Sequence, residues 1–241
     1  MTDIFVLSIR QLTGKWRVLI MLGLGALPVI NAVVSAAFND PVSATQVDAV
    51  LINGMLLSAV LPLIVLSVSS AAFANEVEDR TLSNLTLTPV PRSTVVAAKL
   101  LAAIAVGLPA PLVSGVASYL ILTSGNTVSG GSPYALATGV VAGVVVYSAV
   151  FVWAGLMTGR ALWAGLLYVF LWEGLFSSFV SGVRYMSIRQ YAVGIIHGID
   201  KSRFEDTLNV LSLPVAAGMA LVVFAVFVVL SVRRLRAMDV P

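Results

Sequence analysis

The sequence contains six long apolar stretches, and these limit the possible folds more than any other feature. Each is about twenty residues long, the length that an α-helix needs to cross a hydrocarbon core of roughly 30 Å. Transmembrane β-strands would be about ten residues long and would alternate apolar with polar residues, and these stretches do not alternate. The pattern predicts an all-α integral membrane protein with six transmembrane helices, at about 18–38, 50–74, 100–122, 136–158, 162–182 and 211–232.

The composition agrees with a membrane environment. Only 10% of the 241 residues are charged, whereas a soluble domain carries about 25%. So few charges do not cover a water-facing surface, and we expect a single transmembrane domain over residues 1–241. The first apolar stretch is longer than the roughly 7–15 residues of a signal-peptide core, so we interpret it as a membrane span.

The positions of Lys and Arg predict the orientation, because these residues concentrate in cytoplasmic connections. If the N-terminus is cytoplasmic, ten of the fourteen lie inside, and the other four fall in one outer connection, about 183–210. Six crossings then place both termini in the cytoplasm. The mixture of apolar and basic residues in the outer connection predicts short amphipathic helices at that face of the membrane. Its basic residues are Arg184, Arg189, Lys201 and Arg203.

Residues 1–17 predict a short amphipathic helix before the first span. One face of this helix would carry Phe5, Ile9, Leu12 and Trp16, which recur at helical spacing. We interpret the segment as a helix in the cytoplasmic interface of the membrane, with Trp16 at the depth of the lipid headgroups. An ordinary basic leader before the first span is the alternative.

The connection between the second and third spans, residues 75–98, is the most informative about function. It opens with acidic residues, continues with leucines that give a small apolar face, and ends in prolines that stop a helix. We expect a short helix just below the membrane, suited to docking on a cytoplasmic partner, and a solvated loop is the alternative. The residues concerned are Glu76, Glu78, Asp79, Arg80, Thr81, Leu82, Leu85, Pro89 and Arg92.

This connection resembles the cytoplasmic loop of permease subunits of type-2 ATP-binding-cassette (ABC-2) exporters. That family's pattern runs from a Glu through Gly/Arg-Thr-Leu to Pro, Arg and a Lys that opens the next span. The corresponding positions here are Glu76, Arg80-Thr81-Leu82, Pro89, Arg92 and Lys99, with Arg80 where the family usually has Gly. The N-terminal helix, the six spans and the outer excursion are also similar, so the resemblance covers nearly the whole chain.

The resemblance implies a function and a set of partners. In this family the loop carries a coupling helix that sits in a groove of a separate ATPase subunit, and short re-entrant helices precede the last span. The chain is then expected to be a permease that exports a drug, a lipid or a peptide across a prokaryotic cytoplasmic membrane. Its partners would be two ATPase copies, a second permease, identical or similar, and membrane lipid. ATP and magnesium would bind the ATPase, and this chain would carry no cofactor.

Glu173 is the only charged residue within the predicted spans. A charge inside a membrane is costly, so such a residue is by default a functional hypothesis. It can be protonated, paired with an arginine such as Arg184, or bound to backbone at the seam of a dimer, and both a structural role and a direct role in transport stay open. An ion-coupled secondary carrier or channel that uses Glu173 is the alternative function, and a structural or signalling subunit is another.

Several kinds of chemistry are missing from the sequence. There is no cysteine for a thiol nucleophile or disulfide, and the single histidine, His197, does not make a metal site. The Gly14-Lys15 pair lacks the upstream glycine and the following Ser or Thr of a nucleotide-binding P-loop. We therefore expect a transport subunit without enzymatic activity or metal. The net charge of +3 is too small to indicate a nucleic-acid partner.

Overall fold

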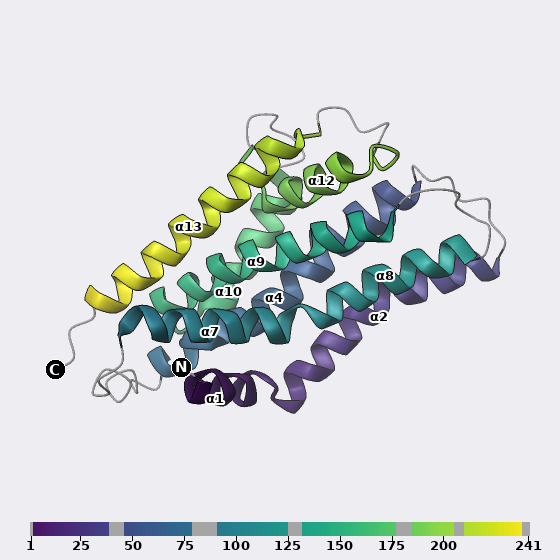
Figure 1. Cartoon of the computed structure of the whole chain (residues 1–241). Coiled ribbons are helices and arrows are strands. Elements are labelled where there is room, and N and C mark those ends of the chain that lie inside the picture. Colours follow the sequence, from purple (N-terminus) through teal and green to yellow (C-terminus); the bar gives the residue numbers. More distant parts are fainter. Residues whose placement is uncertain are drawn as a thin grey trace.

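The computed structural model describes residues 2–38, 46–78, 91–124, 132–176, 185–204 and 210–237, which form helices and no strand (Figure 1). This confirms the predicted all-α class. The backbone of η1 and of η2 is wound as a π-helix. In chain order the helices are α1 (Thr2–Leu12), α2 (Lys15–Ala37), η1 (Val47–Val60), α4 (Leu61–Ser69), α5 (Ala71–Glu78), α7 (Arg92–Gly107), α8 (Pro109–Ser124), α9 (Pro133–Met157), α10 (Ala161–Leu167), η2 (Tyr168–Phe176), α12 (Ile188–Ile199) and α13 (Leu213–Ala237).

Five helical stretches within the described ranges are long and apolar enough to cross a membrane. The predicted span at 162–182 corresponds to α10 and η2, which the structure describes as far as Phe176. Five of the six predicted crossings therefore have a full-length helix, and the sixth stays a prediction. The five stretches are Lys15–Ala37, Val47–Glu78, Arg92–Ser124, Pro133–Met157 and Leu213–Ala237.

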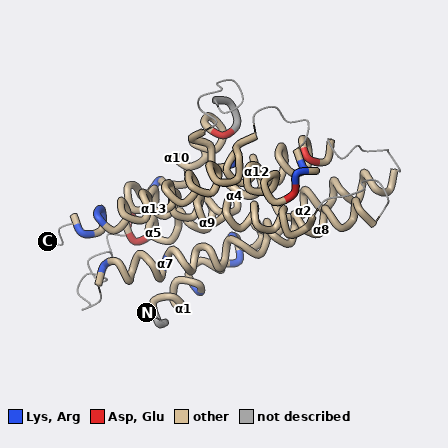
Figure 2. The backbone as a smooth tube through the Cα atoms, turned by 45° about the horizontal axis from the view of Figure 1, so that its top comes forward, with Lys and Arg blue, Asp and Glu red and all other residues tan. Residues whose placement is uncertain are grey.

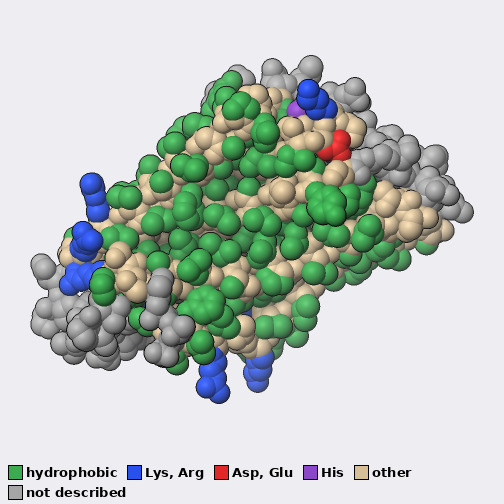
Figure 3. Space-filling model, viewed as in Figure 1, with side chains coloured by type: hydrophobic (Ala, Val, Ile, Leu, Met, Phe, Trp, Pro, Cys, Tyr) green, Lys and Arg blue, Asp and Glu red, His purple; other side chains and the backbone are tan. Residues whose placement is uncertain are grey.

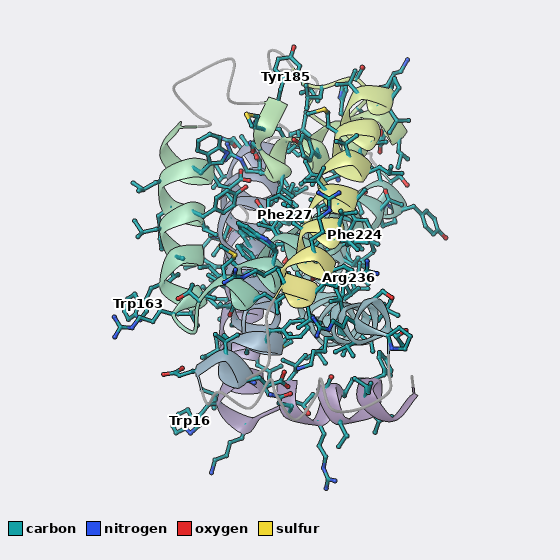
Figure 4. The ribbon with its side chains drawn as sticks, turned by 90° about the vertical axis from the view of Figure 1, so that its left-hand side faces the viewer. Trp16, Trp163, Tyr185, Phe224, Phe227 and Arg236 are labelled. Carbon is teal, nitrogen blue, oxygen red and sulfur yellow. The ribbon has the colours of Figure 1, made fainter. Side chains whose placement is uncertain are left out.

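An apolar belt separates the charged ends of the molecule. Figure 2 shows long lengths of backbone without charge, and Figure 3 shows hydrophobic side chains across the middle of the visible face, with Lys and Arg near its edges. Trp16 and Tyr185 are exposed and lie at opposite ends (Figure 4). Amphipathic rings favour the two membrane interfaces, so this placement is typical of a membrane-spanning protein. Helix α1 and the last turn of α13 lie at the same end (Figure 1).

Helix α9 is the central helix of the bundle. About 72% of its apolar stretch is buried, and α4, α12 and α13 pack against it. Gly139 permits the close approach of α12, because a side chain at this position would collide with Ile196. On the other side, the Phe227 ring of α13 meets the Trp153 ring edge to face, with centroids 5.2 Å apart. Helices α2 and α13 are only 17% buried along their apolar stretches and form outer faces of the bundle.

A break at Leu108 divides the third crossing into α7 and α8. Pro109 starts α8 and cannot donate a backbone hydrogen bond, which explains why the helix is interrupted there. The two halves have different neighbours: α7 packs against α1 and α4, whereas α8 packs along α2 and α9. The third crossing therefore changes partners at its midpoint.

Candidate functional site

Glu76 and Lys99 lie at the two ends of the motif found in the sequence, and their side chains contact each other inside the bundle. The Lys99 ammonium forms an ion pair with Glu76 Oε1, donates a 2.6 Å hydrogen bond to the carbonyl of Ala72, and lies 4.5 Å from the centroid of the Phe73 ring. Lys99 is only 2% exposed. A buried ammonium needs such partners because it has lost its hydration. The pair therefore fixes the end of α5 against α7.

Arg92, at the start of α7, ties this helix to the end of α13. Its Nη1 donates hydrogen bonds of 2.7 Å and 2.6 Å to the carbonyls of Leu235 and Arg236. Carbonyls in the last turn of a helix have no partner within the helix, and the helix dipole favours a positive charge there. Arg92 thus joins the C-terminal end of the connection between the second and third crossings to α13.

Three of the predicted coupling residues are described, and they lie at the two ends of the segment. Besides Glu76 and Arg92, these include Glu78, which ends α5 with an exposed side chain. Its Cβ lies 3.1 Å from where a side chain at Gly159 would begin, so the turn between α9 and α10 also reaches this region. The other predicted residues lie outside the described ranges: Asp79, Arg80, Thr81, Leu82, Leu85 and Pro89. The coupling helix itself stays a prediction.

The N-terminal helix is shorter than predicted. Helix α1 ends at Leu12, and Trp16 belongs to α2, which starts after Gly14. Leu12 is fully buried, and Phe5 and Ile9 pack against the hydrophobic core. Trp16 is 71% exposed and points away from the bundle (Figure 4). The predicted four-residue face is therefore wrong at its last member, because the chain changes direction between the two helices.

Glu173 is fully buried and binds the start of α12. The Ser187 hydroxyl donates to Oε2 at 2.5 Å and the Ile188 backbone N–H donates to Oε1 at 2.9 Å. The Tyr168 hydroxyl makes a longer contact of 3.3 Å. Ser187 caps α12 by accepting a hydrogen bond from the backbone N–H of Gln190. Because a helix start has unsatisfied N–H groups and a positive dipole end, it stabilises a carboxylate.

The partner found for Glu173 is a backbone N–H group, as in one of the expected alternatives, but it belongs to α12 of the same chain and not to a dimer seam. Arg184, the arginine named as a possible partner, lies outside the described residues. The carboxylate also influences α12 further along. Burial and the nearby Glu173 carboxylate raise the pKa of Tyr191, a residue of α12, to about 12.

A second buried ion pair, between Asp48 and Arg203, joins the start of η1 to the segment after α12. Arg203 Nη1 lies 2.6 Å from Asp48 Oδ1, and both side chains are about 5% exposed or less. The Phe204 backbone N–H donates to Asp48 Oδ2 at 2.9 Å. Phe204 has a φ of 57°, which is uncommon for an aromatic residue, and this hydrogen bond helps to hold it. The Arg203 guanidinium also lies 4.7 Å from the centroid of the Tyr119 ring, on α8.

The sequence gives only a weak signal for this second pair. Asp48 and Arg203 both fall in connections predicted on the outer side, but they are 155 positions apart and no motif links them. Nearby, Asp200 accepts hydrogen bonds from Ser202 and from the backbone N–H of Ser132, at the start of α9. Burial acts to raise the pKa of Asp200, but these hydrogen bonds and Arg203 outweigh it, so the pKa lies below its usual value.

A family model described as an ABC-2 family transporter protein matches residues 14–171. The match includes the described ends of the connection between the second and third crossings, with Glu76, Arg92 and Lys99. No curated protein matches the chain.

Proposed function

The chain belongs to the ABC-2 transporter family, and we propose that it is the permease subunit of an ATP-driven exporter. Family membership makes it a membrane subunit of an ABC transport system. The proposal adds that a separate ATPase supplies the energy, that the substrate moves outward across a prokaryotic cytoplasmic membrane, and that both termini are cytoplasmic. It also adds that the segment from Glu76 to Arg92 receives the mechanical force that the ATPase generates.

The attachments of this segment carry the proposal. Glu76 and Lys99 join α5 to α7 through an ion pair whose ammonium group is buried, and Arg92 joins α7 to the last turn of α13. A displacement of residues 79–90 would therefore be transmitted to α5, α7 and α13 together. These attachments support a coupling role better than a solvated loop, which would need no such ion pair at its base.

The proposed partners are those that the family resemblance implies. Two ATPase copies would bind ATP and magnesium and close on each other, and each would press on one coupling segment. Because each chain has one such segment, two permeases are needed, either identical or similar. The substrate, a drug, a lipid or a peptide, would leave between the two permeases toward the face that carries α12.

The alternative, an ion-coupled carrier or channel that uses Glu173, has less support. A transported ion would need a carboxylate that can change its partners during each cycle. The Glu173 carboxylate accepts hydrogen bonds from Ser187 and Ile188, which ties it to the start of α12. Membership of the ABC-2 family does not favour this alternative either.

Co-purification with a separate ABC ATPase subunit tests the proposal. We expect the complex to hydrolyse ATP, and inverted vesicles that contain it to accumulate a fluorescent amphiphile only when ATP is supplied. Replacing residues 79–90 by a Gly-Ser linker of equal length is expected to abolish ATPase binding. The control replaces residues 39–45 in the same way and is expected to retain it. Accumulation driven by a proton gradient without any ATPase would overturn the proposal in favour of the carrier.

A further inference from the structure

An apolar groove of about 490 Å³ lies between α2 and α8, on an outer face of the bundle. Its walls are almost entirely apolar, and small residues on both helices keep it open. The break at Leu108 explains its origin, because α8 follows α2 whereas α7 turns toward α1. Residues that line it include Val18, Leu22, Gly25 and Ala26 on α2 and Pro109 and Val113 on α8.

The length of the groove corresponds to one membrane leaflet. Its α2 wall runs from Val18 to Ile30, which is about 18 Å at a rise of 1.5 Å per residue. Half of a hydrocarbon core of roughly 30 Å is about 15 Å. The groove therefore extends from the membrane interface at the α1 end to about the middle of the membrane.

Positive charge lies directly beyond the interfacial end of the groove. Lys15 and Arg17 precede Val18 on α2, and Lys15 is exposed. Trp16 stands between them and is exposed as well, as expected of a side chain at headgroup depth. An apolar groove that ends at basic residues fits a molecule with one long apolar part and an anionic head.

We propose that this groove binds one acyl chain of an anionic phospholipid, whose headgroup phosphate contacts Lys15 and Arg17. The charge at the interfacial end favours a lipid over an apolar helix of a second copy, because such a helix would bring no anionic group to Lys15 and Arg17. Basic residues at the surface attract anionic lipids over zwitterionic ones.

Native mass spectrometry of the purified chain tests the proposal without any ATPase, so its outcome is independent of the proposed exporter function. The probes are phosphatidylglycerol and phosphatidylcholine with identical acyl chains, each added to the delipidated protein. We expect one phosphatidylglycerol per chain to be retained with a roughly tenfold preference over phosphatidylcholine. The Lys15→Gln/Arg17→Gln variant is expected to lose this preference. The control, Arg233→Gln/Arg234→Gln, removes two exposed arginines near the end of α13 and is expected to keep it.

A second set of variants tests the groove itself. Ala26→Phe places a ring inside the groove and is expected to reduce phosphatidylglycerol retention at least fivefold. Leu27→Phe adds a ring at the neighbouring position, which does not line the groove, and is expected to retain the lipid. Val113→Phe fills the groove from α8 and serves if Ala26→Phe does not fold. Equal retention of the two lipids by the native chain would overturn the proposal. Unchanged retention in both groove-filling variants, or a change in oligomeric state in place of lipid loss, would also overturn it.

Discussion

The Lys99 ammonium and the Glu76 carboxylate form an ion pair within the bundle, at the place where the chain leaves α5 and returns in α7. The two residues are 23 positions apart and belong to different membrane crossings. Lys99 also holds the Ala72 carbonyl, so one ammonium group contacts both the backbone and a side chain of α5. The contact closes the base of the segment that we propose to receive force from the ATPase.

Removing one member of this pair is expected to cost more than removing both. Lys99→Met leaves the Glu76 carboxylate without its cation and should lower the free energy of unfolding by about 3 kcal/mol. The double variant Lys99→Met/Glu76→Leu should recover much of that loss. Thermal unfolding in detergent measures both, with Lys201→Met as the control at an exposed lysine. Equal destabilisation in the single and double variants would contradict a paired role.

Arg92→Gln is expected to loosen the end of α13. The variant removes two charge-assisted hydrogen bonds to the Leu235 and Arg236 carbonyls, and such bonds contribute about 1.5–3 kcal/mol each when well formed. Because Arg92 is only partly buried, we expect backbone amides in the last turn of α13 to exchange hydrogen roughly tenfold faster. Arg236→Gln is the matched control, since Arg236 contributes only its carbonyl. Slow exchange retained in Arg92→Gln would count against the tie between α7 and α13.

Glu173→Gln is expected to preserve assembly and to alter ATP turnover or export. The amide keeps one acceptor oxygen, but its NH₂ group cannot accept the hydrogen bond from Ser187 or Ile188. The start of α12 should then open more often, which hydrogen exchange at residues 188–190 would detect. Tyr168→Phe removes only the longer 3.3 Å contact and should have a smaller effect. Native exchange, turnover and export in Glu173→Gln would together contradict a role for this carboxylate.

Asp48→Leu is expected to destabilise the outer end of the bundle. It leaves Arg203 buried without its carboxylate and the Phe204 N–H without its acceptor, so we expect a loss of about 3–5 kcal/mol. Asp48→Leu/Arg203→Leu removes both charges and should be less destabilised than the single variant. Lys201→Leu, at an exposed lysine of the same segment, is the control. Thermal unfolding of the three variants measures the difference, and an unaffected Asp48→Leu would show that the pair does not hold this end.

The sequence predicted the helical class and five long apolar helices, and both are confirmed because apolar length is a property of contiguous residues. It also singled out Glu76, Arg92 and Lys99 through a local motif, and their role in coupling stays a prediction. The partners of these residues could not be predicted in the same way. Arg92 binds carbonyls more than 140 positions away, and Asp48 finds Arg203 only because η1 and the segment after α12 meet in space. The break between α1 and α2 was also missed, because the helical spacing of the apolar residues continues through Gly14.

The second crossing, Val47–Glu78, is held by an ion pair at each end, Asp48 with Arg203 and Glu76 with Lys99. Each of these contacts joins one end of this helical stretch to a different neighbouring segment. If the Glu76 end of this stretch is displaced, the Asp48 end must follow, or one of the two ion pairs must break at a considerable cost in free energy. In an ABC-2 permease this geometry gives a mechanical route through the membrane along one continuous stretch of chain. Movement at the ATPase side would then reach the opposite face without passing through loops.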